Sequence, residues 1–347
     1  MTCCRSVTIL FFICTLAGCG GGGGEPGAAA PGVAEPQPSV VTGSVPGVVG
    51  AAVDSGVDGA FAYVERRGSV TVAARGVQDR GDAVPADPDA LFKIASLSKL
   101  FIAVSVTQLA HQGQLSLDDT IATWLPALAG RIENADVITV RQLVRHRSGV
   151  PDFDSEPGFS WQNAHTSTFD TLAFALDQPA DFAPDARFAY SNTNYVLLAL
   201  ILDEALGFSH QMWIEEFILA RLGLANTFYV LDDAPRERLV RGYWDGRETT
   251  FIDYAIPGGS MVSTLRDVGV FTRSLATGQL LSDEERALYR GLYWFEHSGW
   301  VPGFQSRTAW VEDLDAVVVL FINNTGGGSE DVLSTTFDNL VLVTREE

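Results

Sequence analysis

The chain contains little cysteine, and all of it lies at one end. Its four cysteines fall within the first nineteen of 347 residues, at Cys3, Cys4, Cys14 and Cys19. The sequence after Cys19 therefore excludes a disulfide framework and a cysteine nucleophile. A chain of this length buries enough apolar surface to fold without disulfides or a structural metal.

Positive charge is also scarce. The sequence has 23 lysines and arginines against 43 aspartates and glutamates, which gives a formal net charge of −20. Nucleic-acid binding needs a positive surface to meet the phosphates, so we expect no nucleic-acid partner. Only two of the basic residues are lysines, Lys93 and Lys99. A lysine in a chain that otherwise avoids lysine is a candidate for a specific role.

The sequence also has no hydrophobic run long enough to span a bilayer. An apolar stretch, residues 7–14, follows Arg5 and leads into Leu16-Ala17-Gly18-Cys19. This pattern resembles the signal of bacterial lipoproteins, which is cut before a cysteine that then carries lipid. We therefore predict a lipoprotein signal peptide over residues 1–18, lipid on Cys19, and an exported protein that is anchored to a membrane and faces the periplasm or the cell exterior. An ordinary secretory signal is the alternative.

Composition divides the rest of the chain into two parts. Residues 20–44 consist mostly of Gly, Ala, Pro and Val, and they cannot bury enough apolar surface to fold. We predict a flexible tether over residues 19–44 and one folded domain over residues 45–347. Apolar residues make up 46% of the whole sequence and charged residues 19%, which excludes wholesale disorder.

The predicted domain alternates strands and helices. Apolar runs predict strands at residues 48–53, 60–64 and 69–74, with a turn at Arg75-Gly76, and paired strands at 307–311 and 316–322. Helical spacing predicts helices at 94–111, 140–146, 195–206 and 212–222, and Gly326-Gly327-Gly328-Ser329 leads into a last helix through Leu342. Strands at both ends with helices between them predict an α/β (α+β) fold, in which a sheet is built from the N- and C-terminal segments around a helical insertion.

The candidate chemistry begins with Ser96-Leu97-Ser98-Lys99. At the start of a helix, residues i and i+3 share one face, so Ser96 and Lys99 are expected to lie side by side. A serine hydroxyl is a weak nucleophile without a nearby base, and burial turns a lysine into a base by lowering its pKa. The alternative is a surface turn with a solvated lysine. Residues 100–106 make this helix apolar nearly all round, so we expect it to be buried, and a buried lysine needs a reason.

Two further short patterns carry polar side chains. Tyr190-Ser191-Asn192 supplies a phenol that can relay a proton and an amide that can hold a lysine and a substrate carbonyl. Its alternative is a helix N-cap beside a packed tyrosine. His297-Ser298-Gly299 leads toward the C-terminal strands, where a glycine would let a ligand backbone lie against the strand edge. Its alternative is a turn.

In this order, the patterns S-x-x-K, Y-x-N and H-S-G resemble the serine hydrolase family of class C β-lactamases, D-alanyl-D-alanine carboxypeptidases (penicillin-binding proteins) and related esterases. The resemblance runs from about residue 45 to 342 and includes residues 115–126, 138–151, 222–227, 258–264 and 301–304. It implies a β-lactamase/transpeptidase-like fold, with an antiparallel sheet flanked by helices and an all-helical insertion.

The resemblance also implies roles for the matching residues. Ser96 would be the nucleophile that accepts the acyl group. Lys99 would take the proton of Ser96 or position it, and Tyr190 would protonate the leaving group or activate the deacylating water. Which of Lys99 and Tyr190 acts as the base stays open.

The remaining matching residues would bind the substrate. Asn192 would bridge the lysine and the substrate. The backbone N–H of Trp300, with that of the nucleophile, would form the oxyanion hole. His297, Ser298 and Gly299 would lie toward the far end of the substrate.

The third pattern departs from the family, because it begins with His297 where β-lactamases and carboxypeptidases have a lysine that helps to bind the ligand's carboxylate. A neutral imidazole is a poorer counter-ion at pH 7. Tyr293, Trp294 and Trp300 crowd this pattern, so we expect an aromatic-walled site suited to an apolar acyl or ester group. Trp161 and Trp244 are further candidates for this wall.

These expectations favour an esterase or amidase that acts on a small ester, amide or peptide. The alternatives are a D-Ala-D-Ala carboxypeptidase or transpeptidase, or a weak β-lactamase. An alternative of another class is a catalytically idle protein that binds cell-wall peptide or a protein partner.

The other histidines are not predicted to carry chemistry. His146 lies in a loop signature of the family and is expected to be structural. His111, His165 and His210 fit no metal-ligand spacing, so we expect neither a metal nor another cofactor.

Overall fold

The structure, a computed structural model, describes residues 43–346. The predicted signal peptide, residues 1–18, and all but the last two residues of the predicted tether, 19–44, lie outside this range. Within it, no helix combines the length and the apolar character that crossing a membrane requires.

The strands are β1 (Gly59–Arg66), β2 (Ser69–Asp79), β3 (Val84–Pro85), β4 (Phe92–Lys93), β5 (Tyr243–Trp244), β6 (Arg247–Glu248), β7 (Val262–Ser263), β8 (Glu296–Val301), β9 (Phe304–Val311), β10 (Ala316–Ile322) and β11 (Asn324–Thr325). The α-helices are α1 (Val45–Asp54), α2 (Ser98–His111), α3 (Ile121–Trp124), α4 (Val140–Val144), α5 (Thr168–Ala175), α6 (Asn192–Leu206), α7 (His210–Ile214), α8 (Leu265–Thr277), α9 (Asp283–Arg290) and α10 (Ser329–Glu346). Two short helical segments also matter below, the 3-10 turn η1 (Ala95–Leu97) and the π-helical η4 (Glu215–Ala220).

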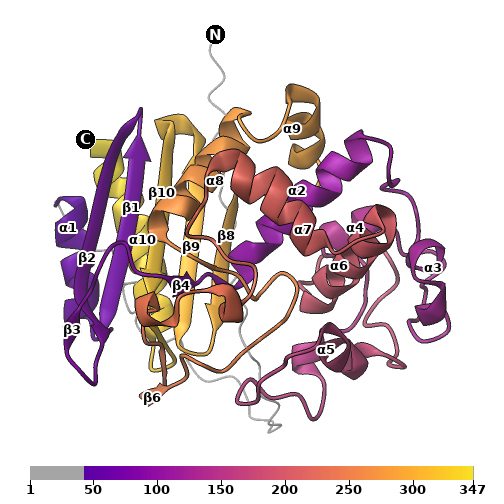
Figure 1. The fold of residues 1–347 in the computed structure, drawn as a ribbon, viewed down its shortest axis with the longest axis horizontal. Helices are drawn as coiled ribbons and strands as arrows, with labels where there is room; N and C mark the ends of the chain where they lie inside the picture. The colour runs from indigo at the N-terminus through magenta and orange to yellow at the C-terminus, as the bar shows by residue number, and fades with distance from the viewer. Residues whose placement is uncertain (1–42, 347) are drawn as a thin grey trace, which may run out of the picture. The chain divides into compact units, whose positions relative to one another are not determined.

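The largest sheet joins the two ends of the domain. Its strands are antiparallel and follow the order β3-β2-β1-β10-β9-β8 (Figure 1). β1 pairs directly with β10, in a register that places Tyr63 opposite Val319. This arrangement confirms the predicted antiparallel sheet from N- and C-terminal segments. It also leaves β8, which carries the third motif, His297-Ser298-Gly299, at the edge of the sheet.

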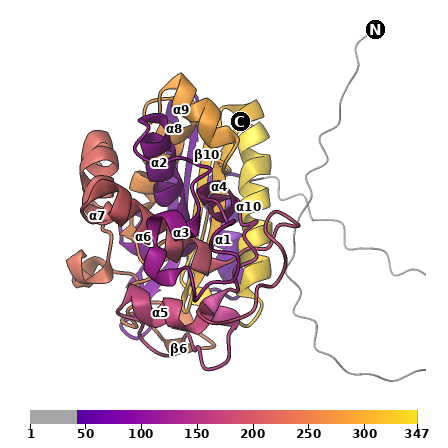
Figure 2. The same ribbon diagram turned by 90° about the vertical axis from the view of Figure 1, so that its right-hand side faces the viewer.

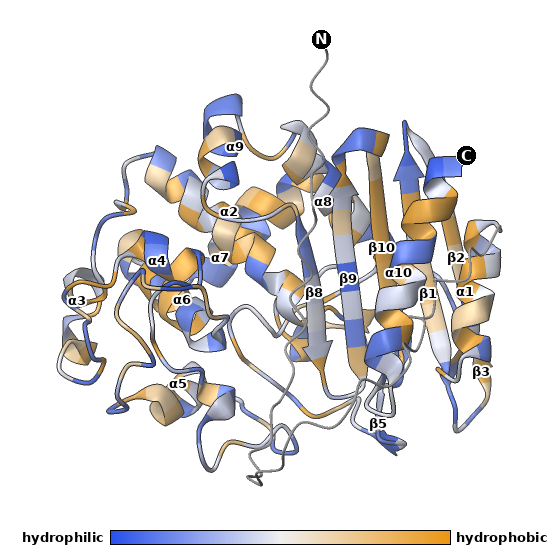
Figure 3. Cartoon of the chain, turned by 180° about the vertical axis from the view of Figure 1, so that it is seen from behind, coloured by the Kyte–Doolittle hydropathy of each residue, from blue (hydrophilic) through white to orange (hydrophobic). Residues whose placement is uncertain are grey.

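The two faces of the sheet belong to separate hydrophobic cores. Along β1, alternate residues such as Ala62 and Val64 pack with α1 and α10, whereas Phe61 and Tyr63 face the core that contains α2 and α8. Figure 2 shows α10 on one side of β10 and α2 and α8 on the other. β10 is covered on both faces, so it is apolar along its whole length (Figure 3).

Helix α2 is the centre of the helical insertion. All its residues from Ser98 to Leu109 are buried, because α6, α7 and α9 pack around it. The structure therefore confirms that the helix bearing Lys99 is buried, as its nearly unbroken apolar sequence predicts.

The strand predicted at residues 48–53 is wrong, because these residues belong to α1. Val45, Val48, Val49 and Ala52 are its buried residues, and they recur at helical spacing. Pro46 lies in the first turn, where a missing N–H is harmless. A short apolar run does not distinguish a strand from a buried helix, and only packing against the sheet decides between them.

The turn predicted at Arg75-Gly76 is also wrong. β2 continues to Asp79, and Gly76 still pairs with Gly59. Gly76 has a φ of +80°, and a Cβ at this position would lie 2.1 Å from the carbonyl oxygen of Asp58. The glycine thus permits a close approach of two chain segments rather than a reversal of the chain.

The predicted helices are present with different ends. The one predicted at 94–111 is the 3-10 turn η1 followed by α2 from Ser98, the one at 140–146 ends as α4 at Val144, and α10 runs to Glu346. The helix predicted from Tyr195 is α6, which begins at Asn192 and ends at Leu206, before Gly207 in a left-handed conformation. The helix predicted over residues 212–222 is α7 followed by η4, so its winding changes at Glu215. The earlier start of α6 places Asn192 in its first turn.

The close packing of α8 on β1 gives a stability test. Gly269 lies in α8 against the ring of Tyr63, and a Cβ there would lie 2.4 Å from a ring carbon. We expect Gly269→Ala to destabilise the protein by about 1–3 kcal/mol through overpacking. Gly50→Ala, in α1 with nothing within 4 Å of its added Cβ, should instead stabilise it by about 0.5–1 kcal/mol through helix propensity. Urea unfolding of both variants checks this, and equal shifts would contradict it.

Candidate functional site

Ser96 lies in η1, the turn that joins β4 to α2. Ala95 before it has a φ of +51°, a left-handed conformation that costs an alanine about 1–2 kcal/mol. Side chains hold this strained turn in place, because Ser306 Oγ donates to the carbonyl of Ile94 over 2.8 Å and Ser98 Oγ donates to that of Ala95 over 2.6 Å. The position of the Ser96 hydroxyl is therefore fixed by the packing of the sheet.

Lys99 lies one turn after Ser96 and is 1% exposed. Its Nζ is 3.1 Å from Ser96 Oγ, 2.9 Å from Asn192 Oδ1 and 2.9 Å from the carbonyl oxygen of Gly258. Burial lowers the pKa of Lys99 to about 7, although Asp152 and Asp154 oppose this shift. The lysine is therefore a neutral amine over much of the physiological range.

Gly258 makes this arrangement possible. Its φ is +76°, and a Cβ there would lie 2.9 Å from Cγ of Lys99 and 3.1 Å from Cβ of Tyr195. Only a residue without a side chain can bring its carbonyl this close to the lysine stem.

Tyr190 approaches Ser96 from another side. Its hydroxyl donates to Ser96 Oγ over 2.9 Å, while the residue as a whole is 37% exposed. Burial of the hydroxyl raises the pKa of Tyr190 far above its ordinary value, and the nearby Asp152 and Asp154 raise it further. The tyrosine is therefore a phenol, a hydrogen-bond donor, at neutral pH.

Asn192 is oriented by two carboxyl groups. Asp152 accepts from the backbone N–H of Asn192 over 2.9 Å and from its Nδ2 over 3.1 Å, and Asp154 accepts from Nδ2 over 3.3 Å. Since a carboxylate only accepts, the amide nitrogen faces the acids and the amide oxygen faces Lys99. Burial and the proximity of the two acids raise the pKa of both.

The contacts around Lys99 accommodate the neutral amine as well as the ammonium. Asn192 Oδ1 and the carbonyl of Gly258 can only accept, so they take two N–H bonds. In the structure Nζ donates to Ser96 Oγ, which also accepts from Tyr190; once Lys99 is neutral, the serine hydroxyl instead donates to the lone pair of Nζ.

The third motif lies on β8, at the edge of the sheet. A Cβ at Gly299 would lie 2.3 Å from Ser306 Oγ and 2.6 Å from the carbonyl oxygen of Ile94. The absent side chain of Gly299 therefore makes room for the protein itself, and the prediction that a ligand backbone lies against this strand edge stays a prediction. The missing side chain lets β8 pack directly against η1, which brings the strand beside Ser96.

The backbone of Trp300 is available for binding. Val301 pairs with Phe304 across a two-residue turn, so Trp300 and Gln305 form the next, non-hydrogen-bonded pair. The N–H of Trp300 therefore points away from β9, toward the open edge of β8. Its role as one of the oxyanion donors stays a prediction.

The side chains around β8 form an aromatic wall. The ring of Trp300 lies 6.0 Å from that of Trp161 and 6.1 Å from that of Trp244. His297 Nε2 lies 2.8 Å from the hydroxyl of Tyr293, and burial lowers the pKa of His297 to about 3. The imidazole is therefore neutral at pH 7. Ser298 is exposed beside it.

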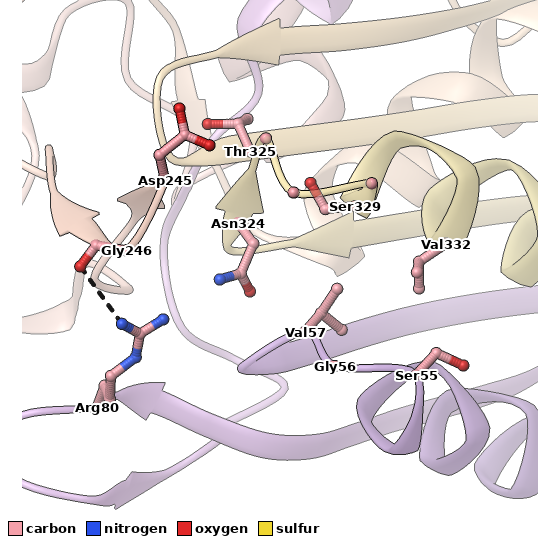
Figure 4. A pocket seen from close by; sticks show the side chains of 13 residues that line it. Ser55, Gly56, Val57, Arg80, Asp245, Gly246, Asn324, Thr325, Ser329 and Val332 are labelled. Atoms are coloured by element: carbon pink, nitrogen blue, oxygen red, sulfur yellow. Dashed lines mark hydrogen bonds between the residues drawn. The ribbon is translucent and has the colours of Figure 1, made fainter.

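A separate hollow lies away from this site. It has a volume of about 280 Å³ at the start of α10 and is lined by residues that include Arg80, Asp245 and Asn324 (Figure 4). Arg80 donates to the carbonyl of Gly246 and is paired with Asp58. The Ser96 group contributes nothing to its lining.

The structure brings together every polar residue singled out in the first two motifs and adds partners that the sequence analysis missed. The missed residues are Asp152, Asp154 and the carbonyl of Gly258. The two acids follow the loop signature at residues 138–151, but only their contact with Asn192 distinguishes them from surface acids. Across residues 43–346, no three His, Cys, Asp or Glu residues gather as metal ligands would.

Comparisons with known proteins show what the chain is similar to. A family model described as Beta-lactamase matches residues 45–293. The chain is 32% identical over 146 residues to penicillin-binding protein 4* of Bacillus subtilis, and this match covers 41% of this chain and 31% of the relative. It is 29% identical over 209 residues to esterase EstB of Burkholderia gladioli, and this match covers 54% of this chain and 51% of the relative. The matches thus span about a third to a half of the length of these curated relatives.

Among solved structures, the D-amino acid amidase of Ochrobactrum anthropi SV3, complexed with L-phenylalanine amide, has a TM-score of 0.79 and 25% identity. The match covers 87% of this chain and 98% of that chain. A penicillin-binding protein from Bacillus halodurans, at 23% identity and a TM-score of 0.71, shares the fold.

The pKa of Lys99 gives a test of the site. Labelling of Ser96 by a fluorophosphonate should be half-maximal near pH 7 and fall about tenfold per pH unit below it, because protonation of Lys99 removes the acceptor for the serine proton. Labelling rates from pH 5 to 9, with the site mapped by mass spectrometry, check this.

Lys93 provides the control, because burial also lowers its pKa to about 7 while its Nζ donates to the carbonyl of Ile252 over 2.7 Å, away from Ser96. Lys93→Met should keep the midpoint, and Lys99→Met should lose labelling at every pH. A midpoint that moves with Lys93 would contradict the assignment.

Proposed function

From the premise that the chain belongs to the beta-lactamase family of serine hydrolases, we propose that it cleaves small esters or amides through an acyl-enzyme on Ser96. The observation that carries this proposal is the position of Ser96 Oγ between a neutral lysine amine and a tyrosine hydroxyl.

In the acylation step, Lys99 is the base. Its lone pair takes the proton of Ser96 as Oγ bonds to the substrate carbonyl carbon, and the carbonyl oxygen becomes an oxyanion. The backbone N–H groups of Ser96 and Trp300 donate hydrogen bonds to this oxyanion and stabilise it. When the oxyanion collapses, the bond to the leaving group breaks. Tyr190 gives a proton to the leaving group, and the proton that Lys99 took from Ser96 then replaces it on the tyrosine.

Deacylation repeats these steps with water. A water molecule gives its proton to the same groups and attacks the acyl carbon, and the Ser96 Oγ leaves as the hydroxyl. Asn192 keeps the lysine amine on Ser96 throughout, because its amide oxygen accepts from Nζ while Asp152 holds its nitrogen.

The walls of the site favour an apolar acyl group without a free carboxylate. His297 is neutral at pH 7, and none of the wall side chains Trp161, Trp244, Trp300 and Tyr293 carries a positive charge. A carboxylate would lose its water there without gaining a counter-ion. An esterase, as EstB is named, or an amidase, as the Ochrobactrum protein is named, therefore fits better than a β-lactamase.

A peptidase is the second candidate. The likeness to penicillin-binding protein 4* favours a D-Ala-D-Ala carboxypeptidase or transpeptidase, or weak β-lactamase action. Either of these would need to bind a substrate carboxylate.

A substrate panel tests the proposal. We expect turnover of a short-chain p-nitrophenyl ester and of an aromatic amino acid amide to exceed that of a D-Ala-D-Ala peptide and a chromogenic cephalosporin by at least about tenfold in kcat/KM. Ser96→Ala should abolish turnover and the fluorophosphonate adduct in intact-mass spectra while leaving the fold unchanged.

The reverse preference in this panel would favour the peptidase. A folded wild-type chain that forms no adduct and turns over no substrate would instead indicate an idle protein that binds cell-wall peptide or a protein partner.

We further propose that lipid on Cys19 tethers the enzyme to a bacterial membrane, in the periplasm or at the cell exterior. The sequence of residues 5–19 supports this proposal. In cells fed radiolabelled palmitate, the full chain should carry label and sediment with membranes, whereas Cys19→Ala should do neither. Cys14→Ala is the matched control and should behave as wild type. Label that survives Cys19→Ala would exclude Cys19 as the lipid site.

A further inference from the structure

One residue outside the group around Ser96 contacts the whole segment that carries Tyr190. His146 follows α4, is fully buried and has a φ of +53°. Histidine is one of the few residues other than glycine that are enriched at positive φ. This conformation places both its carbonyl and its ring against residues 188–191.

The backbone is held on both sides of Tyr190. The N–H of Ala189 donates to the carbonyl of His146 over 2.9 Å. The N–H of Ser191 donates to Nδ1 of the His146 ring over 3.2 Å. Between these two hydrogen bonds, the imidazole lies on the ring of Tyr190, with centroids 4.4 Å apart and planes inclined by 27°. One residue, through its backbone carbonyl and its ring, therefore fixes the position and the tilt of the phenol.

The neighbours of the ring determine its tautomer. Asn194 accepts from Ser148 Oγ over 2.6 Å through Oδ1, so its Nδ2 faces Nδ1 of His146 at 3.4 Å. Nδ1 thus meets two N–H donors and must be an acceptor, which leaves the hydrogen on Nε2. Nε2 has no hydrogen-bond partner among the residues that the structure describes.

The electrostatics keep the ring in this state. Burial lowers the pKa of His146 well below its ordinary value, and the proximity of Lys99 and His297 lowers it further. A protonated ring would turn an N–H toward two donors. His146 therefore remains a neutral acceptor at the pH at which Lys99 is a base.

We propose that His146 is the positioning residue of Tyr190, which keeps the phenol on Ser96 Oγ by holding the backbone on both sides of the tyrosine and stacking on its ring. This inference rests on the proposed role of Tyr190 as the last proton donor to the leaving group. It predicts that His146 matters most where the leaving group most needs a proton, as in alkyl esters and amides. A p-nitrophenolate leaves without one.

A double-mutant cycle in the full chain tests this role. His146→Asn keeps an acceptor and tolerates positive φ but loses the stacked ring. The cycle combines it with Tyr190→Phe. The assay compares kcat on two esters of one acyl group, with p-nitrophenol and an alkyl alcohol as leaving groups, per active site titrated with a fluorophosphonate. Titration counts only folded sites, so partial unfolding does not imitate the effect.

The expected pattern is specific to positioning. Tyr190→Phe should lower kcat on the alkyl ester by about 100-fold or more. His146→Asn should lower it by about tenfold or more, with a smaller loss on the p-nitrophenyl ester and little change in KM. The double variant should be no slower than Tyr190→Phe alone, because the contribution of the tyrosine can be lost only once.

His210→Asn is the matched control, because His210 is also buried and hydrogen-bonded, to Asp203 and Tyr229 on the α7 side of the insertion. It should leave the ratio of the two ester rates unchanged. If His146→Asn yields no titratable sites, His146→Gly, which adopts this φ without strain, takes its place with the same expectation.

Losses that multiply in the double variant, or a His146 variant equally slow on both esters, would overturn the positioning role and leave only packing. A slow Tyr190→Phe beside an unaffected His146→Asn would also overturn it, while the proposed function stands. Full activity in Ser96→Ala would overturn the proposed function itself.

Discussion

The burial of Lys99 is the constraint on which the rest of the site depends. A charged ammonium that is almost fully buried would need a direct acidic partner, and within residues 43–346 Nζ has two amide-type acceptors and a hydroxyl as its partners. The favourable state of the lysine is therefore the neutral amine, with a lone pair that faces Ser96. The left-handed Gly258, the first turn of α6 and the buried residues 98–109 of α2 are all arranged around this one side chain. Burying the lysine costs stability, but it lowers the pKa of the amine and so supplies the base that makes the serine reactive.

The sheet fixes the other half of the chemistry. Gly299 lets the edge strand β8 lie against the turn that carries Ser96, so the free N–H of Trp300 and the nucleophile come from segments about 200 residues apart in the sequence. Ser306 on the neighbouring β9 binds the same turn. The strained Ala95 is therefore held by the sheet, and a change that loosens β8 would disturb the nucleophile and the amide together.

The sequence predicts what depends on local spacing. Ser96 and Lys99 meet because residues three apart share a helix face, and the buried α2 follows from its apolar residues. The order of the motifs indicates the family and, through it, the antiparallel sheet. Contacts set by the tertiary fold were not predictable: the acids at 152 and 154 look like surface residues until α6 is placed beside them. The same holds for Gly299, because the space beside its Cα is occupied by Ser306 Oγ. It also holds for residues 48–53, which form a helix because they pack against one face of the sheet.

The position of Asn192 shows how orientation and charge are separated in this site. A carboxylate in direct contact with Lys99 would orient it well, but it would also stabilise the ammonium and raise the pKa of the base. Asn192 lies between Lys99 and Asp152. Asp152 therefore orients the amide and the amide orients the lysine, without direct contact between the carboxyl group and Nζ. His146 follows the same logic toward Tyr190, since it holds the segment through a neutral acceptor and a ring face. Neutral groups thus hold both proton carriers in place, and the pKa of Lys99 stays near 7, where a base can work.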